Sequence, residues 1–310
     1  KIKMILDNLV KDYKNAIDTL ESYKESAYYL EKKNNYEITK KLISQDRNSG
    51  KILFYKFDIT FPFKIRDKRQ ENIINNILIP EHIYDKLKNK FTGDMNYIDS
   101  YIWTIIYRYQ LLGSNNNQLG VLPGVLDKMK NDFNLNYECF ASTINSTFDK
   151  YCSIYYDVEK YFGSQGSFFN MTPISGTYGF NPPYQKDVMD KGIENILKSL
   201  EKADIDNKEL SFIITIPIWD KLGKKIMKYN YPEKVVKPII EYNEFSSIKL
   251  IFNSNYFKAK LMVPKDKFTY LDHNFHLYKN VTIQHTYILV LSTTNYNFQE
   301  KLNTYNFQKN

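Results

Sequence analysis

The 310-residue sequence lacks features that would indicate a membrane protein or a disulfide-stabilised secreted domain. No run of about 18 apolar residues is present, and the longest apolar segments, 210–219 and 285–292, have the length of buried strands. The two cysteines, Cys139 and Cys152, are too few for a disulfide framework or a zinc site, and neither stands in a CxxC pattern. We therefore expect no membrane association and a reducing intracellular compartment, the nucleus or the cytoplasm.

Metal ligands and glycine-rich phosphate loops are equally scarce. His273, His276 and His285 lie near one another in the sequence, but no carboxylates or cysteines complete a ligand set, so we expect structural or surface roles for them and no metal. The segment YFGSQGSFF (161–169) contains Gly163 and Gly166, which permit close approach of the backbone to a ligand, but it lacks the full GxGxxG spacing. Alone, this loop is a weak signal for ligand binding.

The net charge of +8 is spread evenly over the chain. A mildly basic surface suits a polyanion such as RNA or DNA, although many proteins without such a partner are equally basic. The densest basic stretch, KIRDKR, contains Lys64, Arg66, Lys68 and Arg69. Such a run is either a solvated face or a place where the phosphates of a nucleic acid are held.

Apolar spacing predicts helices in the first part of the chain and alternating strands and helices after it. The predicted helices cover 2–33, 81–91 and 98–112, and an aromatic and β-branched segment at 51–63 is predicted as a strand. From about residue 131, apolar runs of strand length alternate with helical stretches, which is typical of a doubly wound, largely parallel sheet. We predict an α/β protein with a mainly helical domain (1–130), a Rossmann-like domain (131–295) and a polar C-terminal tail (296–310).

The sequence YGFNPPYQ (178–185) carries the clearest chemistry. Two consecutive prolines exclude a helix or a central strand and hold Asn181 at a fixed separation from the ring of Tyr184. An amide beside an aromatic ring suits a planar heterocycle with an exocyclic amine, because the ring stacks on its face while the amide oxygen and a backbone carbonyl accept the N–H protons. Adenine fits this description.

The residues around this loop resemble a known family. NPPY is a form of the [DN]PP[YFW] motif of methyltransferases that act on exocyclic amines. Several segments fall in the order and spacing seen in the phosphorylated-CTD-interacting factor family of cap-specific adenosine N6-methyltransferases: YRYQLLG (107–113), ECFAST.N (138–145), YFGSQGSFF (161–169), SGTYGFNPPY (175–184), ELSFIITIPIW (209–219) and YKNVTIQHTYILVLS (278–292). The resemblance covers roughly 100–295, and we find no trace of the WW domain of animal members.

The resemblance implies a methyl donor, S-adenosylmethionine, and an acceptor, the first transcribed adenosine beside an mRNA cap. It implies capped RNA as the partner, and possible contact with the transcription or capping machinery. The implied acceptor site is Asn181, Pro182, Pro183 and Tyr184. The implied donor site consists of Glu138, Cys139, Phe140, Ala141, Ser142, Gly163, Ser164, Gly166, Ser167 and Phe168.

The implied mechanism needs no metal. The Asn181 oxygen and the Pro182 carbonyl would accept the two N–H groups of the amine and localise its lone pair, Tyr184 would stack on the base, and the rest is proximity. The basic residues from Lys64 to Arg69 could hold a cap triphosphate or the RNA backbone.

Two departures from the family keep other functions open. The family usually has Phe where Tyr184 stands and Pro where Thr143 stands, and Tyr is the usual residue in DNA adenine methyltransferases. The alternatives are therefore a DNA or internal-RNA adenine N6-methyltransferase, and a catalytically silent homologue that binds capped RNA.

Overall fold

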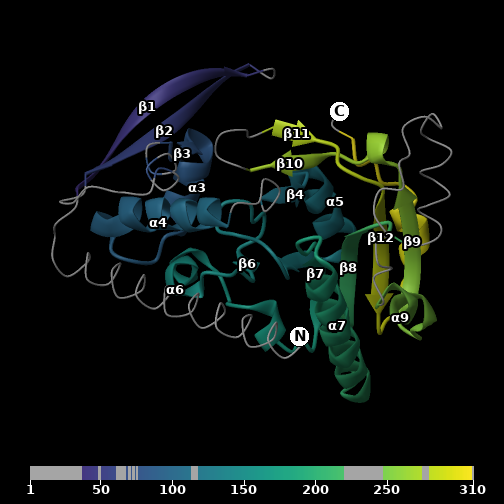
Figure 1. Cartoon of the computed structure of the whole chain (residues 1–310). Helices are drawn as coiled ribbons and strands as arrows, with labels where there is room; N and C mark the ends of the chain where they lie inside the picture. The colour runs from purple at the N-terminus through teal and green to yellow at the C-terminus, as the bar shows by residue number, and fades with distance from the viewer. Residues whose placement is uncertain are drawn as a thin grey trace, which may run out of the picture. The chain divides into compact units, whose positions relative to one another are not determined.

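A computed structural model describes residues 37–47, 50–60, 76–112, 118–219, 247–273 and 279–308, with Lys68, Glu71 and Ile74 (Figure 1). The chain divides into two compact units between Leu78 and Ile79. The helix predicted over 2–33 lies outside the described residues.

The first unit contains a long β-hairpin. Strands β1 (Glu37–Arg47) and β2 (Gly50–Thr60) pair antiparallel from Glu37 opposite Thr60 to Arg47 opposite Gly50. The strand β3 (Leu78–Pro80) is next to β2 in the strand order of this sheet. Of the strand predicted over 51–63, residues 51–60 are confirmed as part of β2, in which Phe54 and Phe57 are buried, and 61–63 lie outside the described residues.

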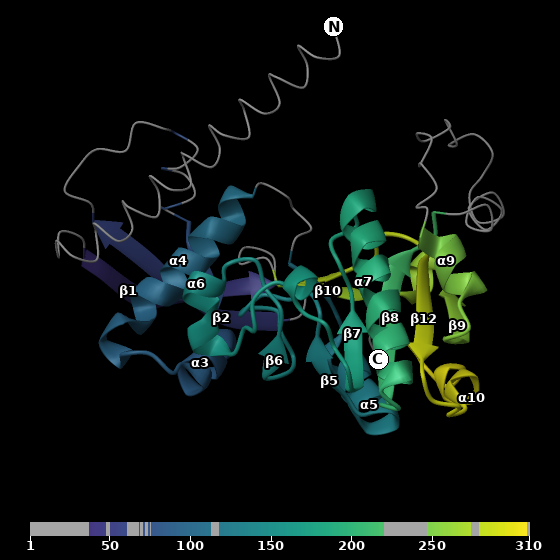
Figure 2. The ribbon, with the colours of Figure 1, turned by 90° about the horizontal axis from the view of Figure 1, so that it is seen from below.

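The second unit is built on a six-stranded sheet in the order β6-β5-β7-β8-β12-β9 (Figure 2). Its strands in chain order are β5 (Leu135–Glu138), β6 (Lys150–Tyr151), β7 (Gly176–Phe180), β8 (Leu210–Pro217), β9 (Phe257–Val263) and β12 (Thr286–Ser292). Every residue of β8 and β12 is buried, as expected for central strands that are covered on both faces.

The sheet is mixed, which corrects part of the prediction of a largely parallel sheet. Strands β6, β5, β7 and β8 are parallel to one another, whereas β12 runs antiparallel to both β8 and β9. A strand that is buried on both faces has the same apolar pattern in either direction, so the sequence could not reveal the reversal.

Helices cover both faces of this sheet. On one face, α7 (Lys186–Ile205) and α9 (Ser247–Asn253) pack Met189, Ile193 and Ile251 against even-numbered residues of β8. On the other face, α5 (Pro123–Phe133) and α10 (Phe298–Leu302) pack against Ile213 of β8 and alternate residues of β12. Figure 2 shows α7 lying across β7 and β8. The helical pattern of VMDKGIENILKSLEKA (188–203), one of the helical stretches expected after residue 131, is confirmed as α7.

The second unit also contains shorter helices and a small second sheet. They are α3 (Glu81–Lys90), α4 (Ile98–Leu111), α6 (Tyr156–Glu159) and a small sheet of β4 (Leu119–Val121), β10 (Tyr270–Asp272) and β11 (Lys279–Val281), with 3-10 turns at Met95–Tyr97, Lys160–Phe162, Phe168–Asn170 and Lys265–Lys267. Of the helices that the structure describes, none is both long enough and apolar enough to cross a membrane.

The compact units differ from the predicted domain boundaries. Helices α3 and α4, which we placed in an N-terminal domain ending at residue 130, belong to the second unit, because their side chains bond to later segments: Arg108 to Asp157 and Lys90 to Asp149. The segment that we predicted as a polar tail contains α10, in which Phe298 and Leu302 are buried.

Candidate active site

The NPPY loop lies at the carboxyl end of a central parallel strand. Asn181 follows directly on β7, which is flanked by β5 and β8, and α7 begins at Lys186. The prolines at 182 and 183 end the strand because proline cannot donate to its hydrogen-bond ladder. Asn181 and Tyr184 are half-buried, Pro182 is buried and Pro183 is exposed. Carboxyl ends of parallel strands are where open α/β sheets bind ligands, so the fold puts this loop where chemistry is expected.

A cavity of about 30 Å³ adjoins the loop. Its polar lining comes from Asn181, Glu138, Asn145 and Thr215, and its apolar lining includes Phe140 and Phe180. This volume corresponds to about one water molecule, so a nucleobase or a methyl donor can enter only if lining side chains move apart.

The two predicted donor segments run along opposite sides of β6 and the residues after it. In the first, the backbone N–H of Ala141 donates to the carbonyl of Cys152 (2.9 Å). In the second, the carbonyl of Gly166 accepts from the N–H of Ser153 (2.9 Å). The structure therefore brings together two segments separated by about twenty residues of sequence.

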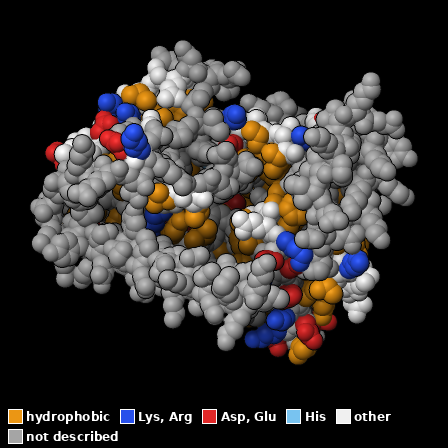
Figure 3. Space-filling model, viewed as in Figure 1, with side chains coloured by type: hydrophobic (Ala, Val, Ile, Leu, Met, Phe, Trp, Pro, Cys, Tyr) orange, Lys and Arg blue, Asp and Glu red, His pale blue; other side chains and the backbone are white. Residues whose placement is uncertain are grey.

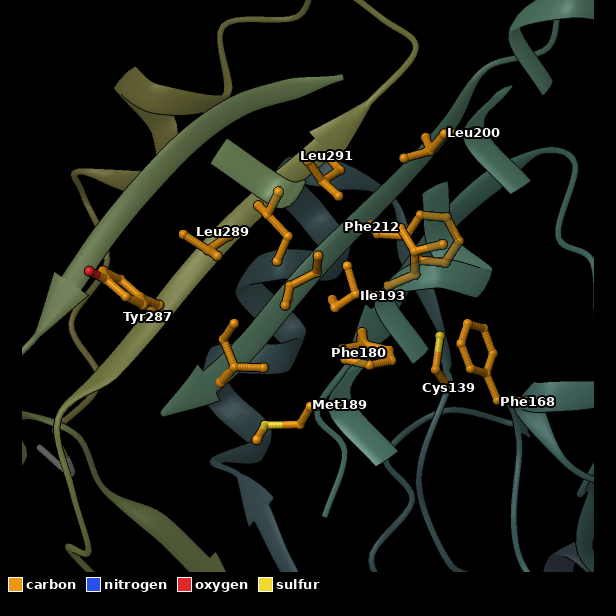
Figure 4. Packing of buried hydrophobic residues seen from close by; sticks show 14 of the residues in the cluster. Cys139, Phe168, Phe180, Met189, Ile193, Leu200, Phe212, Tyr287, Leu289 and Leu291 are labelled. Carbon is orange, nitrogen blue, oxygen red and sulfur yellow. The ribbon is translucent and has the colours of Figure 1, made fainter. Parts of the chain in front are cut away.

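Aromatic rings join these segments to the NPPY loop. The ring of Phe140, in the first donor segment, lies 5.6 Å from that of Phe168, in the second, and 5.4 Å from that of Phe180, next to Asn181. Phe168 and Phe180 are themselves 5.8 Å apart. Figure 4 shows Cys139 between Phe180 and Phe168, with Ile193 and Met189 of α7 on the two sides of Phe180. Three segments that the sequence predicts as functional thus share one cluster.

Several predicted donor residues already have partners within the protein. The Ser142 hydroxyl donates to Oε1 of Gln118 (2.7 Å), and the hydroxyls of Ser164 and Ser153 are 2.7 Å apart. Cys139 is fully buried, and Ser167 accepts from the N–H of Phe169 (3.3 Å). These side chains hold the two segments in shape, and Glu138 and Phe140 are the residues of the first segment that line the cavity.

Gly163 and Gly166 have a conformational reason to be glycine. Their φ angles are +106° and +88°, in the left-handed region that favours residues without a Cβ. A Cβ at Gly163 would also lie 2.4 Å from the carbonyl oxygen of Asp149, whereas at Gly166 the nearest atom would be 3.7 Å away, on Tyr156. Gly163 is therefore required by the fold itself.

Glu138 is the most unusual ionisable group at the cavity. Its Oε2 accepts from the backbone N–H groups of Thr147 (2.7 Å) and Phe148 (3.1 Å). Burial raises the pKa of Glu138 to about 7, and the opposing effects of these N–H groups and of Lys86 only partly offset burial. Such a carboxyl can exist in either protonation state near neutral pH.

Glu159 supports the first donor segment, and sequence reasoning missed it. This fully buried carboxylate accepts from the N–H of Thr143 (2.7 Å), the N–H of Tyr155 (3.1 Å) and the hydroxyl of Tyr109 on α4 (3.0 Å). A single acidic residue in a helical stretch gives no sequence signal of this role. Burial raises its pKa, while the hydrogen bonds act in the opposite direction.

Tyr270 was also missed, because it lies 86 residues beyond the loop that it contacts. Its hydroxyl is 2.6 Å from that of Tyr184 and 3.1 Å from Oγ1 of Thr286. The Tyr184 hydroxyl in turn lies 3.3 Å from Oδ1 of Asn181, to which it donates. The predicted acceptor residues are thus connected to β10 and β12.

The structure describes only some of the other candidates from the sequence. Of the basic cluster, the structure describes only Lys68, which is exposed; Lys64, Arg66 and Arg69 lie outside the described residues, as does His276. His273 and His285 are buried, in keeping with structural roles. Among the residues that the structure describes, no three His, Cys, Asp or Glu side chains form a group that could hold a metal ion.

The exposed face of α7 carries charges of both signs. Figure 3 shows basic and acidic side chains interspersed over this helix, and its sequence alternates them, as at Glu194, Lys198, Glu201 and Lys202. A face of mixed charge does not indicate a binding surface for phosphates.

Comparison with known proteins bears on this site directly. Residues 80–238, which make up about half of the chain, match the sequence model of the family described as "Phosphorylated CTD interacting factor 1 WW domain". The chain belongs to this family. The resemblance drawn from the NPPY loop and its neighbours is thereby confirmed. The matched range contains Asn181–Tyr184 and both donor segments, and it begins after the basic cluster.

Two relatives carry a functional name. The mouse (Mus musculus) and human (Homo sapiens) proteins named mRNA (2'-O-methyladenosine-N(6)-)-methyltransferase are 36% and 35% identical to the chain over 124 residues. These residues make up 38% of this chain and 17% of each relative. The match to the curated relatives thus spans about a sixth of their length.

Proposed function

We propose that the chain is an S-adenosylmethionine-dependent methyltransferase that acts on the exocyclic N6 amine of adenosine in mRNA, at the first transcribed position beside the cap. The observation that carries the proposal is the convergence of Asn181, Glu138 and Phe140 on one cavity at the carboxyl ends of β5 and β7, within the range that matches the family. The names of the mouse and human relatives support the acceptor.

The groups at the cavity suit both ligands chemically. Adenine and the donor both contain a purine ring, which suits contact with the Phe140 side chain at the cavity. The donor also carries hydroxyl and ammonium groups, from which a carboxylate such as that of Glu138 can accept hydrogen bonds. When bound, S-adenosylmethionine supplies an electrophilic methyl group. The residues we assign to it are those of the two segments along β6.

The chain's own contribution is to prepare the amine. Its nitrogen is a poor nucleophile while its lone pair is delocalised into the purine ring. The Asn181 carboxamide oxygen and the Pro182 carbonyl accept its two N–H groups and favour a pyramidal nitrogen. Burial of Pro182 and the half-burial of Asn181 exclude competing water from these acceptors, which strengthens the hydrogen bonds.

A methylation assay with four acceptors tests the proposal. Labelled donor is incubated with RNA that begins cap-adenosine, the same RNA without a cap, single-stranded DNA and duplex DNA, with Asn181→Ala as the matched inactive control. We expect the highest rate on capped RNA. Preference for DNA or for internal adenosines would support the alternative that Tyr184 favours, and capped-RNA binding without turnover would identify a silent homologue.

The proposed function also suggests protein partners for the chain. The family description includes interaction with a phosphorylated CTD, and we propose contact with the transcription or capping machinery for this chain.

A further inference from the structure

Asn195 joins helix α7 to the second donor segment. Its side-chain nitrogen Nδ2 donates to the backbone carbonyls of Phe168 (3.0 Å) and Met171 (3.1 Å). Both partners are carbonyl oxygens, which can only accept, so only the NH₂ end of the carboxamide can serve them. The orientation of the Asn195 side chain is therefore fixed by its partners.

The two carbonyls belong to the turn in which the second donor segment ends. Residues Phe168–Asn170 form a 3-10 turn, closed by the N–H of Met171 donating to the carbonyl of Phe168 (3.1 Å). Carbonyls at the end of a helical turn need partners from outside it. Asn195 supplies such a partner to the carbonyl of Met171 and a second one to that of Phe168.

This turn holds an aromatic ring against the cavity lining. The side chain of Phe168 is fully buried, and its ring lies 5.6 Å from that of Phe140 and 5.8 Å from that of Phe180. Phe140 and Phe180 both line the cavity beside Asn181. A movement of the turn would therefore displace rings that shape the cavity.

Helix α7 also carries the NPPY loop at its other point of attachment. The helix begins at Lys186, directly after this loop. Lys191, one turn before Asn195 on the same side of the helix, places its Nζ 4.8 Å from the ring centre of Phe169, in the 3-10 turn. A single helix thus holds the predicted acceptor loop at its start and the predicted donor segment along its side.

We propose that Asn195 is a positioning residue that fixes the second donor segment against α7, and so sets the distance between a bound methyl donor and the amine held at Asn181. This inference rests on the proposed function, since it concerns how the same site aligns its two ligands. Asn195 acts through the 3-10 turn and contacts the ligands only indirectly.

The chemistry explains why this distance matters. The N6 lone pair forms a bond to the methyl carbon while the carbon–sulfur bond breaks, the sulfur keeps the electron pair as S-adenosylhomocysteine, and the methylated amine releases one proton to water. The reacting atoms must be about 3–3.5 Å apart, and a misplacement of about 1 Å can cost about a hundredfold in rate. A small shift of the donor segment is therefore enough to slow the transfer.

Two variants of Asn195 test the proposal. Asn195→Leu removes both N–H donors and keeps the size of the side chain, whereas Asn195→Ala removes the donors and the size. Both should lower kcat at saturating donor and RNA by about tenfold or more, because neither can hold the turn, while KM for RNA should change by less than about twofold. A role in packing alone predicts instead that Asn195→Leu behaves like the wild type.

Ser199→Ala is the matched control on the same helix. The Ser199 hydroxyl is fully buried and donates to the backbone carbonyl of Asn195 (2.8 Å), so its removal also deletes a hydrogen bond of α7 but leaves the contact with the turn in place. Its kcat should stay within about twofold of the wild type.

The measurement separates positioning from folding. Rates are taken well below the melting temperature of each variant and divided by the number of sites that bind S-adenosylhomocysteine in calorimetry. A purely structural role would lower the melting temperature or the number of binding sites and leave kcat per site unchanged. The positioning role requires that kcat per site itself falls.

Each outcome decides between the claims. Wild-type protein that methylates none of the adenosine substrates would overturn the proposed function and this role with it. An active wild type with Asn195→Leu and Asn195→Ala as fast per site as Ser199→Ala, or with Asn195→Ala alone impaired, would overturn the positioning role and leave the methyltransferase proposal standing.

Discussion

Gly192 on α7 lies directly against the ring of Phe180, the residue that precedes Asn181. A Cβ at position 192 would come within 2.4 Å of Cζ of that ring, and the ring is itself fully buried against Phe140 and Phe168. The absence of a side chain on α7 therefore sets the position of the residue that leads into the NPPY loop.

Substitution of this glycine should damage both stability and the site. Gly192→Ala forces Phe180 to move within a packed cluster, so we expect the free energy of unfolding to fall by about 1–3 kcal/mol, with reduced methylation activity. Gly124→Ala on α5 is the matched control, since a Cβ there meets nothing within 4 Å, and it should be neutral or stabilise by up to about 1 kcal/mol. Urea unfolding of both variants decides the matter; equal stabilities would show that α7 does not constrain Phe180.

The amide of Asn181 should be needed for turnover and not for donor binding. Asn181→Ala removes an acceptor of the amine N–H, so we expect activity to be abolished, while calorimetry with S-adenosylhomocysteine shows nearly unchanged affinity. Substantial residual methylation would remove Asn181 from its assigned role.

The ring of Tyr184 should matter more than its hydroxyl. Stacking depends on the aromatic face, so Tyr184→Phe should remain active and Tyr184→Ala should not. Steady-state rates on adenosine RNA provide the measurement, with the melting temperature as a check on folding. The reverse order of activities would mean that the phenol takes part in the chemistry.

Glu138 should make stability fall as pH rises. Burial raises its pKa from 4.5 in the unfolded chain to about 7, so between these values the folded protein holds a proton that the unfolded chain has released. Stability is then fully present at low pH and is lost as pH rises through the folded pKa. Glu138→Gln keeps an oxygen for the N–H groups of Thr147 and Phe148 but removes the titration.

The comparison of wild type and Glu138→Gln isolates this effect. Between pH of about 5 and about 8, the free energy of unfolding of the wild type should decrease relative to the variant by an amount on the order of 3 kcal/mol. Urea unfolding at both pH values measures it. If the free energy of unfolding depended on pH in the same way in both proteins, Glu138 would not be the group whose pKa is raised.

The two glycines of the second donor segment should differ in their effects. Replacement of either by Val should weaken donor affinity, because each has a positive φ that a β-branched residue adopts at a cost of about 1–3 kcal/mol. Gly163→Val should also lower the melting temperature strongly, owing to the Asp149 carbonyl, whereas Gly166→Val has room for its Cβ. Calorimetry of donor binding to Gly166→Val is thus the cleaner test. Unchanged donor affinity in this variant would show that the donor does not bind at this segment.

The sequence predicted those parts of the fold that local patterns specify. The amphipathic spacing of α7, the proline end of β7 and the segment containing β2 are all local, and all are confirmed. Strand direction at β12 and the packing of α4 against α6 depend on contacts between distant residues, and no local pattern specifies them. The NPPY motif identified Asn181 and the family resemblance identified Glu138, which lie at the carboxyl ends of the neighbouring strands β7 and β5. Tyr270 and Glu159 contact these segments through long-range hydrogen bonds that leave no motif.

Cap dependence is the prediction on which the family-specific acceptor rests. If the basic residues between Lys64 and Arg69 hold a cap triphosphate, RNA that begins cap-adenosine should be methylated far better than RNA with a free 5′ end, and added salt should weaken that preference by screening the phosphates. Charge reversal of Lys64, Arg66, Lys68 and Arg69 should raise KM for capped RNA without altering donor affinity, because these residues precede the range that contains the donor segments. Reversal of Lys198 and Lys202, on the mixed-charge face of α7, is the matched control and should leave KM unchanged. Equal rates on capped and uncapped RNA would refute cap specificity, yet the adenine-amine chemistry assigned to Asn181 would stand.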